Sequence, residues 1–261
     1  MQFGCAEAAG IRAWIAPAAA TMLIALAQGV AAQGALPPGF VYLRDVEPSI
    51  AQDMRYAGSD NFVGRPLPGY EAAECVLRQD VAAALKRVQA DLVGLGLSLK
   101  VYDCYRPMRA VRAMVQWVND GRAEASTKRF FPKLRKGSLL SGYIASQSRH
   151  STGDTIDLTL TKVDAAPAAP FDPAATYGPC TAPAAQRSPD NSVDMGTSFD
   201  CFDSASHTAS SAVTAEQRRW RNVLVEAMRK QGFANYAREW WHFSYTRSGS
   251  QGAYDFPIRP R

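Results

Sequence analysis

The sequence predicts a single α+β domain with a small, mainly antiparallel sheet flanked by helices. Helical stretches alternate with short strand-like stretches, and the connections between them are irregular. Of the 261 residues, 47% are hydrophobic and 20% are charged, which is ordinary for a globular protein and enough for one large domain. The net charge of +5 comes from scattered lysines and arginines rather than from a basic stripe, so nucleic acid is not an expected partner.

The first 32 residues have the features of a secretory signal peptide. Arg12 precedes an apolar run from Trp14 to Ala27, which is too short to span a bilayer comfortably, and small residues follow it. Cleavage after Ala32 is favoured over cleavage after Ala27, and an uncleaved amphipathic anchor is the alternative. Residues 33–261 are therefore expected to form a periplasmic or secreted domain without stable membrane insertion.

Helix and strand periodicities alternate through the first half of this domain. Residues 40–70 are expected to form short strands and turns. The spacing of apolar residues predicts a helix over about 73–93 and a strand over 97–105. Pro107 disfavours a helical conformation for Arg106, so Arg106 is expected where that strand ends and the next helix is about to begin.

The second half of the domain contains one alternating strand, one long helix and a long irregular segment. Residues 156–160 alternate, which places Asp157 on the face opposite the aliphatic side chains. The stretch from Lys162 to Val193 is rich in Ala, Pro, Asp and Ser and is expected to be a surface insertion. A helix is predicted over 214–231, with a capping box at its start, and a last strand over 239–245.

The chain has three histidines, and two of them lie in motifs that could bind a metal. A hydrolytic zinc site needs three protein ligands, an open position for water and a separate carboxylate to take a proton. His150, Asp157 and His242 could be the ligands, and Glu239 could be the carboxylate. Residues three apart point to opposite faces of a straight strand, so the chain would have to bend near Trp240. The alternative is that these are ordinary hydrogen-bonded polar residues and turn caps.

Two motifs resemble the D-alanyl-D-alanine dipeptidases, the VanX-type zinc enzymes of vancomycin resistance and their periplasmic relatives. They are Ser148-x-His150-x-x-Gly153-x-x-x-Asp157 and Glu239-x-x-His242. The resemblance extends, in the same order, over nearly the whole mature chain. The further matching segments are Arg55-Tyr56-Ala57, Asn61-Phe62-x-Gly64, Gly69-Tyr70-Glu71, Tyr105-Arg106-Pro107, Ile156-Asp157-Leu158-Thr159-Leu160, Met195-Gly196, Phe199-Asp200 and Phe256-Pro257.

The resemblance implies a hedgehog/D,D-peptidase-like fold and a set of residue roles. It implies one Zn²⁺ per chain, held by His150, Asp157 and His242. It implies that Glu239 is the general base and acid, and that Arg106 stabilises the oxyanion of the tetrahedral intermediate. For substrate binding it points to Tyr56, Tyr70, Ser148 and Asp200, with Asp200 receiving the free amino group. Thr155 departs from the pattern, because the family usually has alanine there.

The function implied by the resemblance is hydrolysis of the dipeptide D-Ala-D-Ala to two D-alanines, in cell-wall turnover or D-alanine salvage. One alternative is a D,D- or L,D-carboxypeptidase of the same fold that trims peptidoglycan stem peptides. Another is a zinc-stabilised binding domain without catalysis, like hedgehog-like relatives. The presence of both Glu239 and Arg106 argues against the binding domain, which would need neither a base nor an oxyanion partner.

Cleavage of the signal peptide would remove Cys5 and leave four cysteines: Cys75, Cys104, Cys180 and Cys201. An even number in an exported chain favours disulfides, and four cysteines allow three pairings. Of these we predict Cys75–Cys104, which could tie the long helix to the strand that presents Arg106, and Cys180–Cys201, which would close the base of the insertion. Cytoplasmic relatives lack the first two cysteines, which fits an exported enzyme.

Overall fold

The structure is a computed structural model that describes residues 1–4, 36–122, 125–249 and 252–261. The chain divides into two units, Met1–Ala32 and Gln33–Arg261, and all helices and strands described below belong to the second. The expected signal peptide lies almost wholly outside the described residues. Within the described ranges, no helix combines the length and the apolar character that a membrane span requires.

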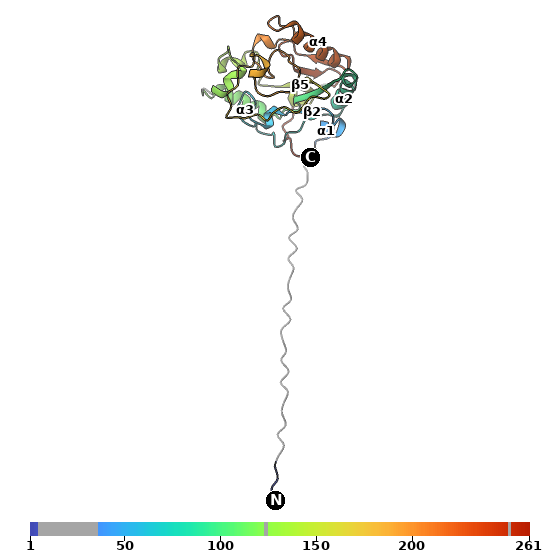
Figure 1. The fold of residues 1–261 in the computed structure, drawn as a ribbon, viewed down its shortest axis with the longest axis vertical. Coiled ribbons are helices and arrows are strands. Elements are labelled where there is room, and N and C mark those ends of the chain that lie inside the picture. The colour runs from blue at the N-terminus through green and yellow to red at the C-terminus, as the bar shows by residue number, and fades with distance from the viewer. Residues whose placement is uncertain (5–35, 123–124, 250–251) are drawn as a thin grey trace. The chain divides into compact units, whose positions relative to one another are not determined.

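Five strands form a mixed sheet in the order β2-β4-β5-β7-β6, in which β2 is parallel to β4 and the other neighbours are antiparallel (Figure 1). A separate antiparallel pair joins β1 and β3. The strands are β1 (Phe40–Tyr42), β2 (Ala51–Gln52), β3 (Val76–Arg78), β4 (Leu97–Asp103), β5 (Thr155–Lys162), β6 (Phe233–Asn235) and β7 (His242–Tyr245). The helices are α1 (Leu43–Val46), α2 (Gln79–Val93), α3 (Met108–Asn119) and α4 (Ala215–Lys230). The predicted α+β class and mainly antiparallel sheet are confirmed.

Helices α2 and α4 pack against each other and against strands of the sheet, and Figure 1 shows them together on the side away from α3. Val81, Leu85 and Val88 of α2 are fully buried, as their helical spacing predicts. The predicted capping box of α4 is present, because the side chains of Thr214 and Gln217 each accept a hydrogen bond from the other residue's backbone N–H.

Three neighbouring strands bring polar residues into one row across the sheet. Asp103 of β4 lies opposite Asp157 of β5, and Asp157 lies opposite His242 of β7. Residues that are direct partners on adjacent strands project from the same face of a sheet. A β-bulge in β4, between Val101 and Asp103, makes this register possible. The row is the foundation of the candidate site.

Several predicted boundaries were wrong. The helix predicted over 73–93 begins only at Gln79, because residues 76–78 pair with β1 instead. The last strand begins at His242 rather than at Glu239, and the preceding residues form a turn that leads back from β6. Strand β6 itself was not predicted; it has only three residues and is defined by its pairing with β7.

The structure contains two disulfides, Cys75–Cys104 and Cys180–Cys201. Cys75 immediately precedes β3 and Cys104 immediately follows β4, so the first bond ties these two strands together, rather than tying helix α2 to β4. All four sulfur-bearing side chains are buried within the core.

We expect peptide mapping of the unreduced protein to recover these two cross-linked pairs. Replacing Cys75 and Cys104 together by alanine should lower the free energy of unfolding by about 3 kcal/mol, because the bond restricts the unfolded chain. Chemical denaturation of both proteins measures this difference. Crossed pairs or four free thiols in the map would contradict the assignment.

Candidate metal centre and active-site cleft

His150 is presented by a tight turn at the start of β5. The 3-10 turn Arg149–Thr152 is capped by the Ser148 hydroxyl, which accepts a hydrogen bond from the backbone N–H of His150. Gly153 ends the turn at φ 77°, a left-handed conformation that glycine adopts without steric cost. The Nδ1 atom of His150 lies 2.8 Å from the carbonyl oxygen of Cys104, which directs Nε2 toward Asp157.

His150, Asp157 and His242 each direct one ligand atom toward a common point. Nε2 of His150 lies 3.3 Å from Oδ1 of Asp157 and 3.3 Å from Nδ1 of His242, and that Nδ1 lies 3.0 Å from the same carboxylate oxygen. Tetrahedral ligands at about 2.0–2.1 Å from a zinc ion are roughly 3.3 Å apart. The three edges therefore fit one face of a zinc tetrahedron. The donor set of two imidazoles and one carboxylate also fits zinc chemistry.

The electrostatic environment of Asp157 keeps it ionised. Burial acts to raise the pKa of this carboxyl, but the adjacent His150 and His242 outweigh burial and hold the pKa well below its ordinary value. An ionised carboxylate is the form that binds a metal ion.

Glu239 reaches the same place from the turn between β6 and β7. Its Oε2 lies 3.7 Å from Nδ1 of His242, and its side chain is 12% exposed. The amide of Asn235 donates hydrogen bonds to the carbonyl oxygens of Glu239 and His242, which fixes the turn. This is the bend near Trp240 that the spacing of the two residues requires. Burial raises the pKa of the Glu239 carboxyl to about 7, within the range suited to proton transfer near neutral pH.

Arg106 is held over the cleft by Asp103, a residue that the sequence did not single out. The Nε and one terminal nitrogen of Arg106 lie 2.9 and 2.8 Å from Oδ2 of Asp103. The guanidinium also lies 4.9 Å from the centre of the Tyr56 ring and 3.6 Å from Oδ2 of Asp157. The i, i+3 spacing of Asp103 and Arg106 is the signal that could have found the pair. Asp103 is fully buried and so fixes the guanidinium next to the candidate metal ligands.

Tyr56 and Asp200 form a second polar pair in the cleft. The Tyr56 hydroxyl donates a hydrogen bond of 2.7 Å to Oδ2 of Asp200. Burial and the negative charge of Asp157 raise the pKa of Asp200 well above its ordinary value. Within the described part of the chain, no salt bridge reaches this carboxylate. The pair can therefore accept a cationic group from a bound ligand.

All but one of the predicted site residues line one cleft of about 390 Å³. These are Tyr56, Arg106, Ser148, His150, Asp157, Asp200, Glu239 and His242. Apolar side chains of Phe62, Met114 and Phe202 complete its walls. The exception is Tyr70, whose hydroxyl lies behind the site and donates a hydrogen bond of 2.6 Å to Asp103. Tyr70 therefore contacts the support of Arg106 rather than the cleft itself.

Comparison with known proteins agrees with this geometry. A family profile described as D-ala-D-ala dipeptidase, Peptidase M15, matches residues 37–169 and 183–258. A D-alanyl-D-alanine dipeptidase of Enterococcus faecalis is 32% identical over 206 residues, which cover 78% of this chain and 90% of the relative. One from Streptomyces coelicolor is 34% identical over 224 residues, or 84% and 98% of the two chains. One from Escherichia coli is 27% identical over 210 residues, or 80% and 86%.

The fold and the buried histidine–aspartate–histidine group define a peptidase with a candidate metal centre. The chain belongs to the Peptidase M15 family of D-Ala-D-Ala dipeptidases. The predicted resemblance and fold are thereby confirmed.

Proposed function

We propose that this chain is a zinc-dependent dipeptidase that hydrolyses D-Ala-D-Ala to two D-alanines. The observation that carries the proposal is the meeting of three groups in one cleft: the metal-ligand set, a buried glutamate and a fixed guanidinium. Neither a binding module nor a purely structural metal site needs the last two. The names of the relatives support the choice of substrate.

The residues divide the hydrolytic work according to their positions. His150, Asp157 and His242 would hold one zinc ion, which supplies Lewis-acid activation of water and of the scissile carbonyl. Glu239 is close to these ligands without being one of them, so it can take the proton of the attacking water and return it to the leaving amine. Arg106, fixed by Asp103, faces the place where negative charge develops on the substrate oxygen.

The ends of the dipeptide would be recognised by opposite charges. Asp200 receives the ammonium group of the substrate, and a buried carboxylate gains a charge-assisted hydrogen bond from it. Ser148, at the turn that presents His150, is our candidate for the terminal carboxylate. The D configuration of the substrate is proposed from the family alone.

Export from the cytoplasm is part of the proposal. Two buried disulfides support an oxidising compartment, and the sequence of the first 32 residues supports secretion. We infer a periplasmic or secreted enzyme that acts in cell-wall turnover or D-alanine salvage.

We expect Arg106→Ala to lower kcat for D-Ala-D-Ala by roughly a hundredfold or more, the scale of losing one oxyanion partner. The guanidinium acts on charge that appears only in the transition state, so KM should change much less. Steady-state kinetics of the purified variant measures both constants. Arg112→Ala is a suitable control, since Arg112 is exposed and pairs with Asp255 outside the cleft. A near-normal kcat in Arg106→Ala would refute the role.

Substrate preference tests the proposed function as a whole. We expect D-Ala-D-Ala to be cleaved roughly a hundredfold or more better, in kcat/KM, than N-acetyl-D-Ala-D-Ala or a stem pentapeptide, because an acylated amine leaves Asp200 unpaired. Asp200→Ala should narrow this gap. The panel is measured by release of free D-alanine, with L-Ala-L-Ala included to test chirality.

The alternative outcomes have definite meanings. Equal cleavage of the pentapeptide would replace the dipeptidase proposal by a D,D- or L,D-carboxypeptidase. Zinc binding without any turnover would favour the non-catalytic binding domain. A gap that survives in Asp200→Ala would show that Asp200 is not the amine partner.

A further inference from the structure

Asp200 has a backbone conformation that the surrounding structure must hold. Its φ is 56°, in the left-handed region, which costs free energy for a residue with a side chain. Beyond residues 1–4, it is the one described non-glycine residue with a positive φ. Asp200 as a whole residue is only 5% exposed. The position of the acid therefore depends on what fixes the turn.

A disulfide and two backbone hydrogen bonds hold the turn from outside the cleft. Cys201, the next residue, is bonded to Cys180. The N–H of Ser198 donates to the carbonyl oxygen of Cys180 at 2.9 Å, and the N–H of Phe202 donates to that of Phe130 at 2.8 Å. Cys180 lies between the two stretches that the family profile matches, so this chain attaches additional sequence directly to the turn.

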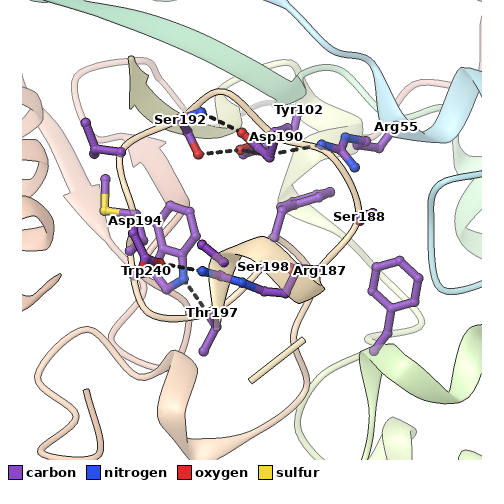
Figure 2. Close-up of a pocket in the computed structure, with 15 residues that line it drawn as sticks. Arg55, Tyr102, Arg187, Ser188, Asp190, Ser192, Asp194, Thr197, Ser198 and Trp240 are labelled. Carbon is purple, nitrogen blue, oxygen red and sulfur yellow. Dashed lines mark hydrogen bonds and ion pairs between the residues drawn. The ribbon is translucent and has the colours of Figure 1, made fainter. Parts of the chain in front are cut away.

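Asp190 forms a second attachment between the same irregular segment and the core (Figure 2). Its carboxylate accepts hydrogen bonds from the Tyr102 hydroxyl at 2.6 Å, Lys100 Nζ at 2.6 Å and Arg55 at 3.1 Å. The side chains of Lys100 and Arg55 are 4% and 8% exposed, whereas that of Asp190 is 25% exposed. The carboxylate thus reaches inward from the surface to two buried cations.

The partners of this carboxylate are directly connected to the amine end of the cleft. The Tyr102 ring stacks on Phe199 with centroids 4.7 Å apart and an interplanar angle of 17°. Phe199 immediately precedes Asp200. Arg55 immediately precedes Tyr56, whose hydroxyl is bonded to the Asp200 carboxylate. Tyr56 is therefore adjacent in sequence to a partner of the Asp190 carboxylate, and Asp200 is adjacent to a residue that stacks on another partner.

We propose that residues 171–190, the bracing segment, position the Asp200 carboxylate for the substrate ammonium. The segment acts through two ties, the Cys180–Cys201 disulfide and the Asp190 carboxylate. This inference rests on the proposed function, in which Asp200 is the amine partner. It assigns the irregular segment a role in specificity rather than a role as a surface loop alone.

Losing the disulfide or the Asp190 contacts should affect substrates selectively, whereas a general loss of protein stability should affect all substrates equally. The strength of a charge-assisted hydrogen bond depends on the positions of its donor and acceptor. A displacement of an active-site group by about 1 Å can reduce the rate roughly a hundredfold. The loss applies only to substrates that carry an ammonium group. Propionyl-D-alanine is D-Ala-D-Ala with the ammonium group replaced by hydrogen, so its turnover gains nothing from a hydrogen bond between that group and Asp200. The informative quantity is the ratio of kcat/KM for the two substrates.

The experiment compares Asp190→Asn, Tyr102→Phe and the double variant Cys180→Ser/Cys201→Ser with the wild-type enzyme. Asp190→Asn leaves buried cations with fewer partners and can impair folding. Tyr102→Phe removes only the hydroxyl bond and keeps the ring that stacks on Phe199. Asp172→Asn is the matched control, because the Asp172 carboxylate caps a turn within the segment itself.

We expect the ratio to fall about tenfold in the double cysteine variant and in Asp190→Asn, and less in Tyr102→Phe, through a higher KM for D-Ala-D-Ala. It should not change in Asp172→Asn. An unchanged ratio in Tyr102→Phe and in the double variant, or equal losses on both substrates, would overturn the positioning role while leaving the proposed function intact. Absence of D-Ala-D-Ala hydrolysis by the wild-type enzyme would overturn both.

Discussion

Replacing Glu239 by glutamine is expected to abolish detectable hydrolysis of D-Ala-D-Ala while zinc stays bound. The amide has nearly the same shape as the carboxylate but cannot accept a proton at neutral pH. Loss of a general base costs roughly 100- to 10,000-fold in rate, and here one group serves as both base and acid, so the upper end is expected. Single-turnover assays and elemental analysis of the same sample measure the two parts of the prediction.

The retention of zinc distinguishes a general base from a metal ligand. Glu239 lies beside His242 but outside the group of three ligand atoms. Glu226→Gln is a matched control, because Glu226 is an exposed glutamate on α4 that pairs with Arg229 and is not among the residues that line the cleft. If Glu239→Gln lost its metal in proportion to its activity, the assignment of Glu239 as a non-ligand base would be wrong.

Removal of the metal is expected to eliminate activity completely and reversibly. Dialysis against a chelator should give inactive protein, and one equivalent of Zn²⁺ should restore turnover, because the three ligand atoms are already within 4.8 Å of one another. His150→Ala should lower both the zinc content and the activity to background. Elemental analysis and D-alanine release report these quantities separately.

His207→Ala is the natural control, since His207 is the third histidine of the chain and lies outside the candidate metal group. It should keep one zinc per chain and normal turnover. Active protein without a stoichiometric transition metal would exclude the zinc mechanism. Activity that persists in His150→Ala would exclude this ligand set.

The sequence was most informative where a residue's role depends on local pattern. The capping box of α4, the burial of one face of α2 and the non-helical position of Arg106 before Pro107 follow from neighbours a few residues apart, and the structure contains all three. The candidate metal ligands were identified because histidines are few and their motifs resemble a family. Resemblance, rather than periodicity, supplied the proposed roles of Arg106 and Asp200.

The features that could not be predicted from the sequence depend on contacts between distant segments. Tyr70 was expected in the substrate site, but its hydroxyl contacts Asp103, 33 residues away. The start of α2 was misplaced because pairing with β1 competes with helix formation over residues 76–78. The ties of Asp190 to Lys100 and Tyr102 join residues about 90 positions apart, and no local pattern marks them. Tertiary contacts override local preference in each case.

The β-bulge in β4 changes which residues of that strand face the core. Up to Val101, alternate residues face the apolar core, and continued alternation would send Asp103 there as well. The extra residue reverses which face of the sheet the following side chains occupy, so Asp103 points to the site instead of the core. A regular strand with the same sequence would place Asp103 among the core side chains, away from Arg106. The irregular backbone at this point, as well as residue identity, therefore decides which face of the sheet Asp103 occupies.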